Sequence, residues 1–256
     1  MSVLGERGQP CPPACTLHEL ADKAVRAPVL QVLNHKYGCM PVLLNKNTPF
    51  PDPALAGPDG LVAVGGDLGV ERLLAAYRMG IFPWTVQPIT WWSPDPRAIF
   101  ELDGFHVPQS LARVNRRGRF EVTMDRSFRA VMEGCATPAP GRSGAWITEE
   151  FIEAYTRLHR RGHAHSVECR LGGELVGGIY GVAIGGLFAG ESMFHRVNDA
   201  SKVALVHLVE HLRRRGFALF DIQMTTPATK PFGAVGIPRR EYLRRLAAAV
   251  KMKCSF

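Results

Sequence analysis

The chain has 256 residues, enough for one large domain or two modest ones, and its 46% of apolar residues is typical of a globular protein. No stretch approaches the run of roughly 20 apolar residues that a membrane helix needs, which argues against a membrane-spanning segment. Lys and Arg number 31 against 23 for Asp and Glu, and the resulting net charge of +8 favours a polyanionic partner such as RNA.

Residues 1–39 show no clear hydrophobic period and contain several prolines, so we interpret them as an N-terminal extension that is mobile or not native. We hypothesise that translation starts at Met40, where the folded body begins. Residues 1–13 lack the apolar core of a signal peptide, which predicts a cytoplasmic protein with no membrane partner. The six cysteines lack the paired spacing of a metal site, so we expect free thiols, and neither a metal site nor a cysteine nucleophile.

Residues 40–97 are rich in turns and are expected to form a small N-terminal domain with one helix, Val70 to Met79. Three tryptophans crowd into the end of this segment. Large aromatic side chains in Pro-rich loops are unfavourable to leave in water. We therefore expect Trp91 and Trp92 to pack in the interior, and Trp84 to offer a surface on which a base can stack.

Residues 98–256 change to a regular alternation of strands and helices, and are expected to form a second, larger domain. The expected strands are 97–102, 119–124, 164–170, 175–183, 187–194 and 218–224, and the expected helices are 110–117, 128–135, 149–161 and 199–216. An antiparallel meander followed by a helix and a further strand predicts an α+β fold with a mixed, mostly antiparallel sheet covered by helices.

The last helix of this series is amphipathic and has clear signals at both ends. Leucine and valine recur on it at helical spacing and mark a buried stripe. Asp199 or Ser201 can cap its first turn with a side-chain oxygen, and Gly216 can take the left-handed conformation that ends it.

Polar residues interrupt the two apolar strands on either side of this helix. Asp221 and Gln223 are two residues apart, which on a regular strand makes them neighbours on one face, and Glu191 follows a glycine on the preceding strand. A carboxylate and an amide are unfavourable to bury without partners. Each residue alone fits a turn or a strand edge equally well, but the three together indicate a functional site.

With these residues in hand, the sequence resembles the leucyl/phenylalanyl-tRNA–protein transferase family of bacteria. The matching runs are Gly65–Leu68, Gly80–Trp84, Trp91–Arg97, Trp146–Ile147, Gly162–Glu168, Leu175–Gly178, Gly190–Phe194, Ala200–Lys202, Asp221–Gln223 and Ile237–Arg240. Each run is weak alone, but together, in the expected order, they are highly specific.

The resemblance implies a small N-terminal domain followed by a domain of the GNAT acetyltransferase type. It implies an aminoacyl-tRNA–protein transferase that moves leucine or phenylalanine, with methionine as a third candidate, from its tRNA to the N-terminal amine of proteins beginning with Arg or Lys. The product would be marked for degradation. No cofactor is implied, because the aminoacyl ester is already activated. The partners would be the 3′ end and acceptor stem of Leu-tRNA and Phe-tRNA. The sequence leaves the oligomeric state open, and our own expectation is a monomer.

The resemblance also assigns roles to residues. Asp221 would orient Gln223, whose carbonyl oxygen would draw a proton from the attacking amine, and Glu191 would hold the cationic acceptor or the aminoacyl amine. The remaining positions would bind substrate: Trp84 and Trp146 at the terminal adenosine and amino acid, and Ile179, Phe188 and Leu208 in the apolar pocket. Family members commonly carry a histidine after the Asp-x-Gln run, and residues 225–230 lack it, so no role for it is carried over.

Two other functions are open to this sequence. An acyl-CoA-dependent N-acetyltransferase would need a Gly-rich turn before the helix to cradle a pyrophosphate, and residues 195–199 contain no glycine. A non-catalytic RNA-binding module would explain the charge and the tryptophans, but it assigns no role to Asp221, Gln223 and Glu191.

Overall fold

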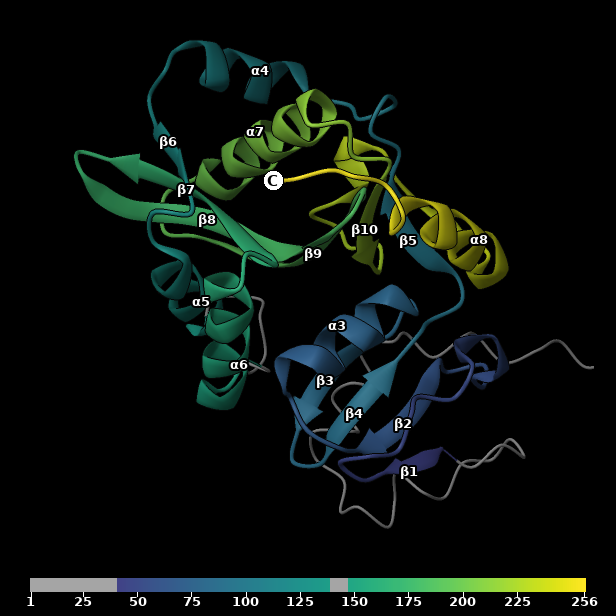
Figure 1. Ribbon diagram of the computed structural model, residues 1–256. Coiled ribbons are helices and arrows are strands. Elements are labelled where there is room, and N and C mark those ends of the chain that lie inside the picture. The colour runs from purple at the N-terminus through teal and green to yellow at the C-terminus, as the bar shows by residue number, and fades with distance from the viewer. Residues whose placement is uncertain (1–40, 139–146) are drawn as a thin grey trace, which may run out of the picture.

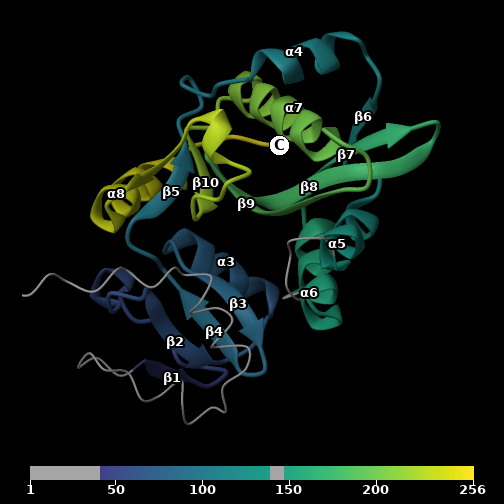
Figure 2. The same cartoon turned by 180° about the vertical axis from the view of Figure 1, so that it is seen from behind.

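The computed structural model describes residues 41–138 and 147–256, which form two sheets and the helices around them (Figures 1 and 2). The expected extension over 1–39, Met40 and Trp146 lie outside the described residues. The smaller sheet has four strands in the order β1-β2-β4-β3, with β1 parallel to β2 and the other pairs antiparallel. These strands are β1 (Val42–Leu44), β2 (Leu61–Gly65), β3 (Phe82–Val86) and β4 (Ile89–Trp92).

The larger sheet has seven strands in the order β11-β5-β10-β9-β8-β7-β6. Every pair in it is antiparallel except β9 and β10, which are parallel. Its strands are β5 (Arg97–Phe100), β6 (Glu121–Met124), β7 (Ala164–Leu171), β8 (Glu174–Ile184), β9 (Leu187–His195), β10 (Leu219–Gln223) and β11 (Ala234–Ile237). The parallel connection from β9 to β10 runs through one long helix, as parallel neighbours require.

Helices cover both faces of the larger sheet (Figure 1). On one face lies α7 (Ala200–Arg214) with α4 (Gln109–Arg116) packed against it, and on the other lie α5 (Phe128–Ala136) and α6 (Glu149–Arg160). Helix α3 (Val70–Arg78) packs between the smaller sheet and the α6 side of the larger one, and α8 (Arg239–Ala249) packs on β10. Short 3₁₀ turns are present at Pro53–Leu55 and Lys230–Phe232.

Helix α7 agrees with its sequence-based prediction except at its N-cap. Its apolar stripe is buried against the sheet, and Gly216 ends it with a φ of 75°. Asp199 is the N-cap residue, but its side chain accepts no hydrogen bond from the helix backbone. The predicted side-chain cap is therefore wrong: Asp199 has a left-handed backbone, and its carboxylate instead accepts from Lys202 Nζ at 3.0 Å.

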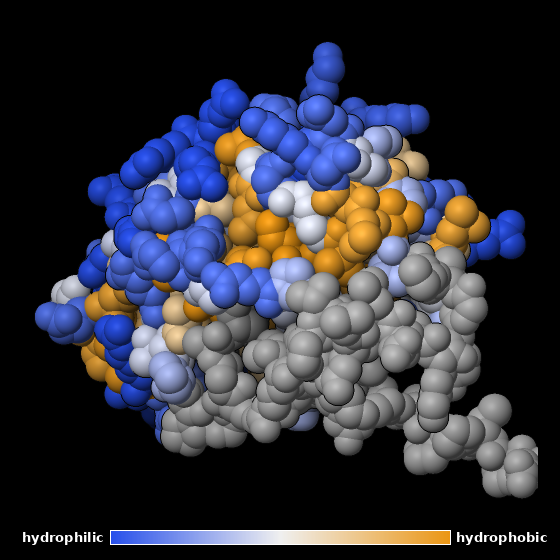
Figure 3. Space-filling model, turned by 90° about the horizontal axis from the view of Figure 1, so that it is seen from below, coloured by the Kyte–Doolittle hydropathy of each residue, from blue (hydrophilic) through white to orange (hydrophobic). Residues whose placement is uncertain are grey.

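One continuous core joins the smaller sheet to helices α3, α5 and α6 and to strand β8. Trp91 and Trp92 belong to this core and are 0% and 4% exposed, which confirms that they pack in the interior. Leu43 and Leu55 remain exposed. The view from below shows apolar surface next to a region of hydrophilic side chains (Figure 3).

The α+β class, with a small N-terminal sheet and a larger mixed sheet, is confirmed. The strands of the smaller sheet, β11 and α8 were not predicted. No helix in the described part of the chain combines the length and apolarity that a membrane crossing requires.

Candidate functional site

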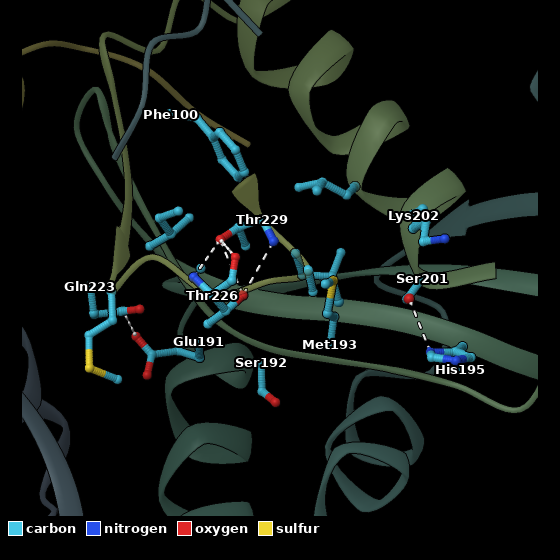
Figure 4. A pocket seen from close by; sticks show the side chains of 16 residues that line it. Phe100, Glu191, Ser192, Met193, His195, Ser201, Lys202, Gln223, Thr226 and Thr229 are labelled. Atoms are coloured by element: carbon cyan, nitrogen blue, oxygen red, sulfur yellow. Dashed lines mark hydrogen bonds between the residues drawn. The ribbon is translucent and has the colours of Figure 1, made fainter. Parts of the chain in front are cut away.

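The site lies where two parallel strands part. β9 and β10 pair only from Leu187–Leu219 to Ala189–Asp221, and the residues that follow on both strands line a cavity of about 330 Å³. The first turns of α7 close one end of this cavity, and Gln223 and Glu191 lie at the other (Figure 4). The parting of the two strands thus coincides with the cavity that these residues line.

A second cavity of about 150 Å³ adjoins the first. Phe82, Pro83 and Trp84 of β3 form its aromatic wall, so the smaller sheet contributes directly to the site. Trp84 packs edge-on against Trp92 with ring centroids 5.7 Å apart, and it remains partly exposed. Both cavities are lined by Glu191 and Gln223, which therefore stand at their boundary.

Asp221 is fully buried and lines neither cavity. Its Oδ1 accepts from Arg97 Nε at 2.8 Å and its Oδ2 from Arg97 Nη2 at 2.7 Å, a two-pronged ion pair. Tyr242 Oη also donates to Oδ2, at 2.8 Å. Burial lowers the pKa of the Arg97 guanidinium, but the charge and hydrogen bonding of Asp221, together with the neighbouring Tyr242 and Glu191, outweigh this effect, so the pKa is raised.

Gln223 does not share a regular strand face with Asp221, so that prediction is wrong. The register of β10 against β5 shifts between the two residues, and Gln223 has a left-handed φ of 55°. Its backbone N–H donates to Asp221 Oδ1 at 2.9 Å, while its side-chain Nε2 donates to Glu191 Oε1 at 3.0 Å. Asp221 therefore holds the backbone of Gln223, and Glu191 holds its carboxamide.

Glu191 is partly buried among hydroxyl and amide donors. Burial raises the pKa of its carboxyl to about 8, and hydrogen bonds from Tyr77 and Tyr155 oppose this shift. These two tyrosines are themselves buried and hydrogen-bonded to each other, and burial raises the pKa of both hydroxyls. The carboxyl is therefore mostly protonated at neutral pH.

The predicted apolar pocket is only partly made of the predicted residues. Ile179 lines the larger cavity, whereas Phe188 and Leu208 are 1% and 0% exposed and lie in the core behind it. Trp146 lies outside the described residues. Further apolar lining comes from Phe100, Met193, Leu205, Ile222 and Met224.

Sequence reasoning missed Arg97, Tyr77, Tyr155 and Tyr242 as parts of the site. One signal was available for Arg97, since a lone cation at the start of an apolar strand needs a buried partner. No sequence feature singled out the three tyrosines, because on the buried side of an amphipathic helix a tyrosine is indistinguishable from an ordinary core residue. In the described part of the chain, no three His, Cys, Asp or Glu side chains are grouped to hold a metal ion.

Solved structures resemble this chain only distantly. A structure described as L-PGS from Bacillus licheniformis covers 69% of this chain and 61% of its own at 15% identity, with a TM-score of 0.39. A ribosomal-protein-alanine N-acetyltransferase from Brucella melitensis biovar Abortus covers 39% of this chain and 75% of its own at 18% identity, with a TM-score of 0.28. Similarities this low support no conclusion about this chain.

Sequence comparisons are far stronger. The family model described as leucyl/phenylalanyl-tRNA protein transferase matches residues 99–247, and the model of that family's N-terminal domain matches residues 66–95. The leucyl/phenylalanyl-tRNA–protein transferase of Nitratidesulfovibrio vulgaris is 56% identical over 79% of this chain and 88% of its own length. The enzyme of the same description from Anaeromyxobacter dehalogenans is 53% identical over 83% of this chain and 93% of its own. The chain therefore belongs to the leucyl/phenylalanyl-tRNA–protein transferase family, which confirms the enzyme class and the reaction expected from the sequence.

Proposed function

We propose that this protein transfers leucine or phenylalanine, with methionine as a third candidate, from aminoacyl-tRNA to the N-terminal amine of proteins that begin with Arg or Lys. The observation that carries the residue assignments is the placement of Gln223 and Glu191 at the boundary of two cavities. One cavity has an aromatic wall and the other an apolar lining, which suits the two halves of an aminoacylated adenosine.

The terminal adenosine of the donor would lie against Trp84, because a base stacks on an exposed aromatic ring whatever its sequence context. The leucine or phenylalanine side chain would enter the larger cavity beside Ile179 and Met193. Such a pocket selects by size and shape, at about 1–3 kcal/mol per methylene. Phe188 and Leu208 would support this lining from the core, and Trp146 would contact the donor as the resemblance implies.

The transfer is the aminolysis of an ester. The acceptor amine attacks the ester carbonyl carbon, a C–N bond forms, the C–O bond to the ribose breaks, and the ribose hydroxyl leaves with a proton. Gln223 directs its amide nitrogen to Glu191, which leaves the carbonyl oxygen to accept a hydrogen bond from the attacking amine. The pKa of Glu191, about 8, is close to the roughly 7.7–8.0 of an α-amine, so the ionised form of this carboxyl, whose share grows as pH approaches 8, can take up the amine's proton.

The wider setting is also part of the proposal. Residues 40–97 act as a small domain that supplies the Trp84 wall, and residues 98–256 as the catalytic domain that supplies Gln223 and Glu191. The basic surface holds the tRNA acceptor stem without reading its sequence. The protein acts in the cytoplasm, where aminoacyl-tRNA is made, as a monomer that marks its protein products for degradation.

The test is transfer of radiolabelled leucine from Leu-tRNA to matched proteins that begin with Arg, Lys, Asp or Glu. We expect transfer to the first two, little to the others, and a loss of about 100-fold in kcat for Gln223→Ala, because a positioned hydrogen-bond acceptor contributes on that order. Equal transfer to all four acceptors would refute the acceptor class. A fully active Gln223→Ala protein would refute the assigned role, as would RNA binding without any transfer.

A further inference from the structure

Arg97 is a buried cation that binds Asp221 on β10 and Gly80 ahead of β3 without lining either cavity. It is the first residue of β5 and is 1% exposed. Its side chain donates to Asp221 through Nε and Nη2, and to the backbone oxygen of Gly80 through Nη1 at 2.9 Å. A guanidinium with its donors fixed in this fork sets the relative positions of the groups that it binds.

On one side, the ion pair reaches Gln223 through Asp221. Each carboxylate oxygen of Asp221 already accepts two hydrogen bonds: Oδ1 from Arg97 and the Gln223 backbone, and Oδ2 from Arg97 and Tyr242. Because these contacts occupy the carboxylate, Asp221 serves as a fixed support and not as a base. Gln223 has a left-handed backbone that a residue with a Cβ rarely adopts, so this support is what makes the conformation persist.

On the other side, Arg97 reaches the aromatic wall. Gly80 precedes β3 by two residues, and the guanidinium carbon lies 5.0 Å from the centre of the Phe82 ring. A Cβ added at Gly80 would come within 2.8 Å of both Tyr242 and Leu243, so the smaller sheet meets α8 closely at this point. Arg97 thus binds the smaller sheet at the base of the strand that carries Trp84.

We propose that Arg97 is a positioning residue for the transfer reaction, which sets the spacing between the Gln223 carboxamide and the Trp84 wall by holding Asp221 and Gly80 at once. The inference rests on the proposed role of Gln223. The donor ester and the acceptor amine must meet between these two groups, and a misplacement of about 1 Å can reduce a rate by 100-fold.

The chain offers a matched control for a purely structural role. Arg239, at the start of α8, is 9% exposed and also ties the larger body to the smaller sheet. It donates to the backbone oxygens of Ser93 and Ala56 at 2.7 and 2.8 Å, and it contacts neither Asp221 nor a cavity-lining residue through these bonds. Arg239→Lys therefore measures what losing a buried guanidinium does to stability alone.

The experiment compares Arg97→Lys with Arg239→Lys by thermal unfolding and by steady-state transfer of leucine from Leu-tRNA to an Arg-initial peptide. We expect both variants to lower Tm. We expect only Arg97→Lys to lower kcat, by about tenfold or more, with KM for each substrate nearly unchanged, because positioning acts on the bound complex. Equal kcat values for the two variants would overturn the inference.

A double-mutant cycle with Gln223→Ala identifies the route of the effect. If Arg97 acts through Gln223, Arg97→Lys causes little further loss of kcat in the Gln223→Ala background; losses that multiply overturn the inference. If Arg97→Lys does not fold, Tyr242→Phe takes its place in the cycle, with the same two outcomes. An inactive Gln223→Ala with an unimpaired Arg97→Lys refutes only the role of Arg97, whereas a fully active Gln223→Ala refutes both assignments.

Discussion

At the scale of single residues, the site depends on the burial of three ionisable side chains, Arg97, Asp221 and Glu191. Asp221 is paired with the Arg97 guanidinium through two hydrogen bonds. Glu191 forms no salt bridge within the described part of the chain, and burial raises the pKa of its carboxyl to about 8 although the charge of Arg97 opposes the shift. Two carboxyls on neighbouring strands thus have different surroundings, and that of Glu191 can exchange a proton near pH 8.

Glu191 should make the stability of the protein depend on pH in a definable window. An unfolded glutamate has a pKa near 4.5 and the folded carboxyl one of about 8, so between these values the folded state binds more protons than the unfolded state. The free energy of unfolding should therefore fall as pH rises from about 4.5 to about 8, by up to about 1.4 kcal/mol per pH unit from this residue.

Urea unfolding of the wild type and of Glu191→Gln at pH 5, 6, 7 and 8 measures this contribution. Glutamine keeps the hydrogen-bonding shape of a protonated carboxyl and does not titrate. As pH rises, the wild type should therefore lose stability relative to Glu191→Gln. A difference that stays constant across the window would contradict the raised pKa.

At the scale of elements, the sequence predicted most of the larger sheet and its helices because their apolar residues recur with a clear period. The helix expected over 149–161, for example, is observed at Glu149–Arg160. Helix α8 was not predicted, because only Tyr242, Leu246 and Ala249 bury its apolar side and basic residues dominate the rest. The smaller sheet was missed because its strands are short and separated by Pro and Gly turns, so no alternation develops.

The site itself was predictable in its residues but not in its geometry. A carboxylate and an amide on an apolar strand indicated a site, and Gln223 and Glu191 do meet. The left-handed backbone of Gln223 could not be read from the sequence, because a regular strand is the default for five residues rich in apolar side chains. That single irregularity separates the surroundings of Asp221 from those of Gln223.

Helix α5 gives a test of packing at this scale. Gly134 lies in the helix interior, where alanine is ordinarily more stable by about 1 kcal/mol. A Cβ at this position, however, would come within 2.6 Å of the Phe194 ring on β9. We expect Gly134→Ala to lower the free energy of unfolding by about 1–3 kcal/mol, as other overpacked cores do.

Chemical denaturation of Gly134→Ala, Phe194→Leu and the double variant checks this account. The smaller leucine should relieve the clash, so the double variant should be more stable than the sum of the two single changes predicts. Additive losses would show that the ring is not the obstacle.

At the scale of the whole molecule, some basic clusters are neutralised by acidic side chains and others are not. Arg244 and Arg245 on α8 are both paired with Glu241. On α4, by contrast, Arg113, Arg116 and Arg117 are exposed, and among the described residues none of them forms a salt bridge. Helix α4 packs against α7, and His207 of α7 bonds Asn115 of α4 at 3.0 Å. The α4 arginines therefore lie on a helix that packs against α7, and the first turns of α7 line the larger cavity.

This arrangement predicts which arginines carry the affinity for the tRNA donor. Each phosphate contact releases counterions, so the dependence of log Kd on log salt concentration counts such contacts. Replacing Arg113, Arg116 and Arg117 together by glutamine should weaken binding of uncharged tRNA and reduce the salt slope by about one per lost contact. Arg244→Gln, the control, should leave the slope nearly unchanged because its charge is already neutralised by Glu241. Filter binding at salt concentrations between about 50 and 300 mM measures both slopes. If Arg244→Gln and not the α4 variant changed the slope, α8 would carry the phosphate contacts, and the donor stem would approach from the other side of the cavity.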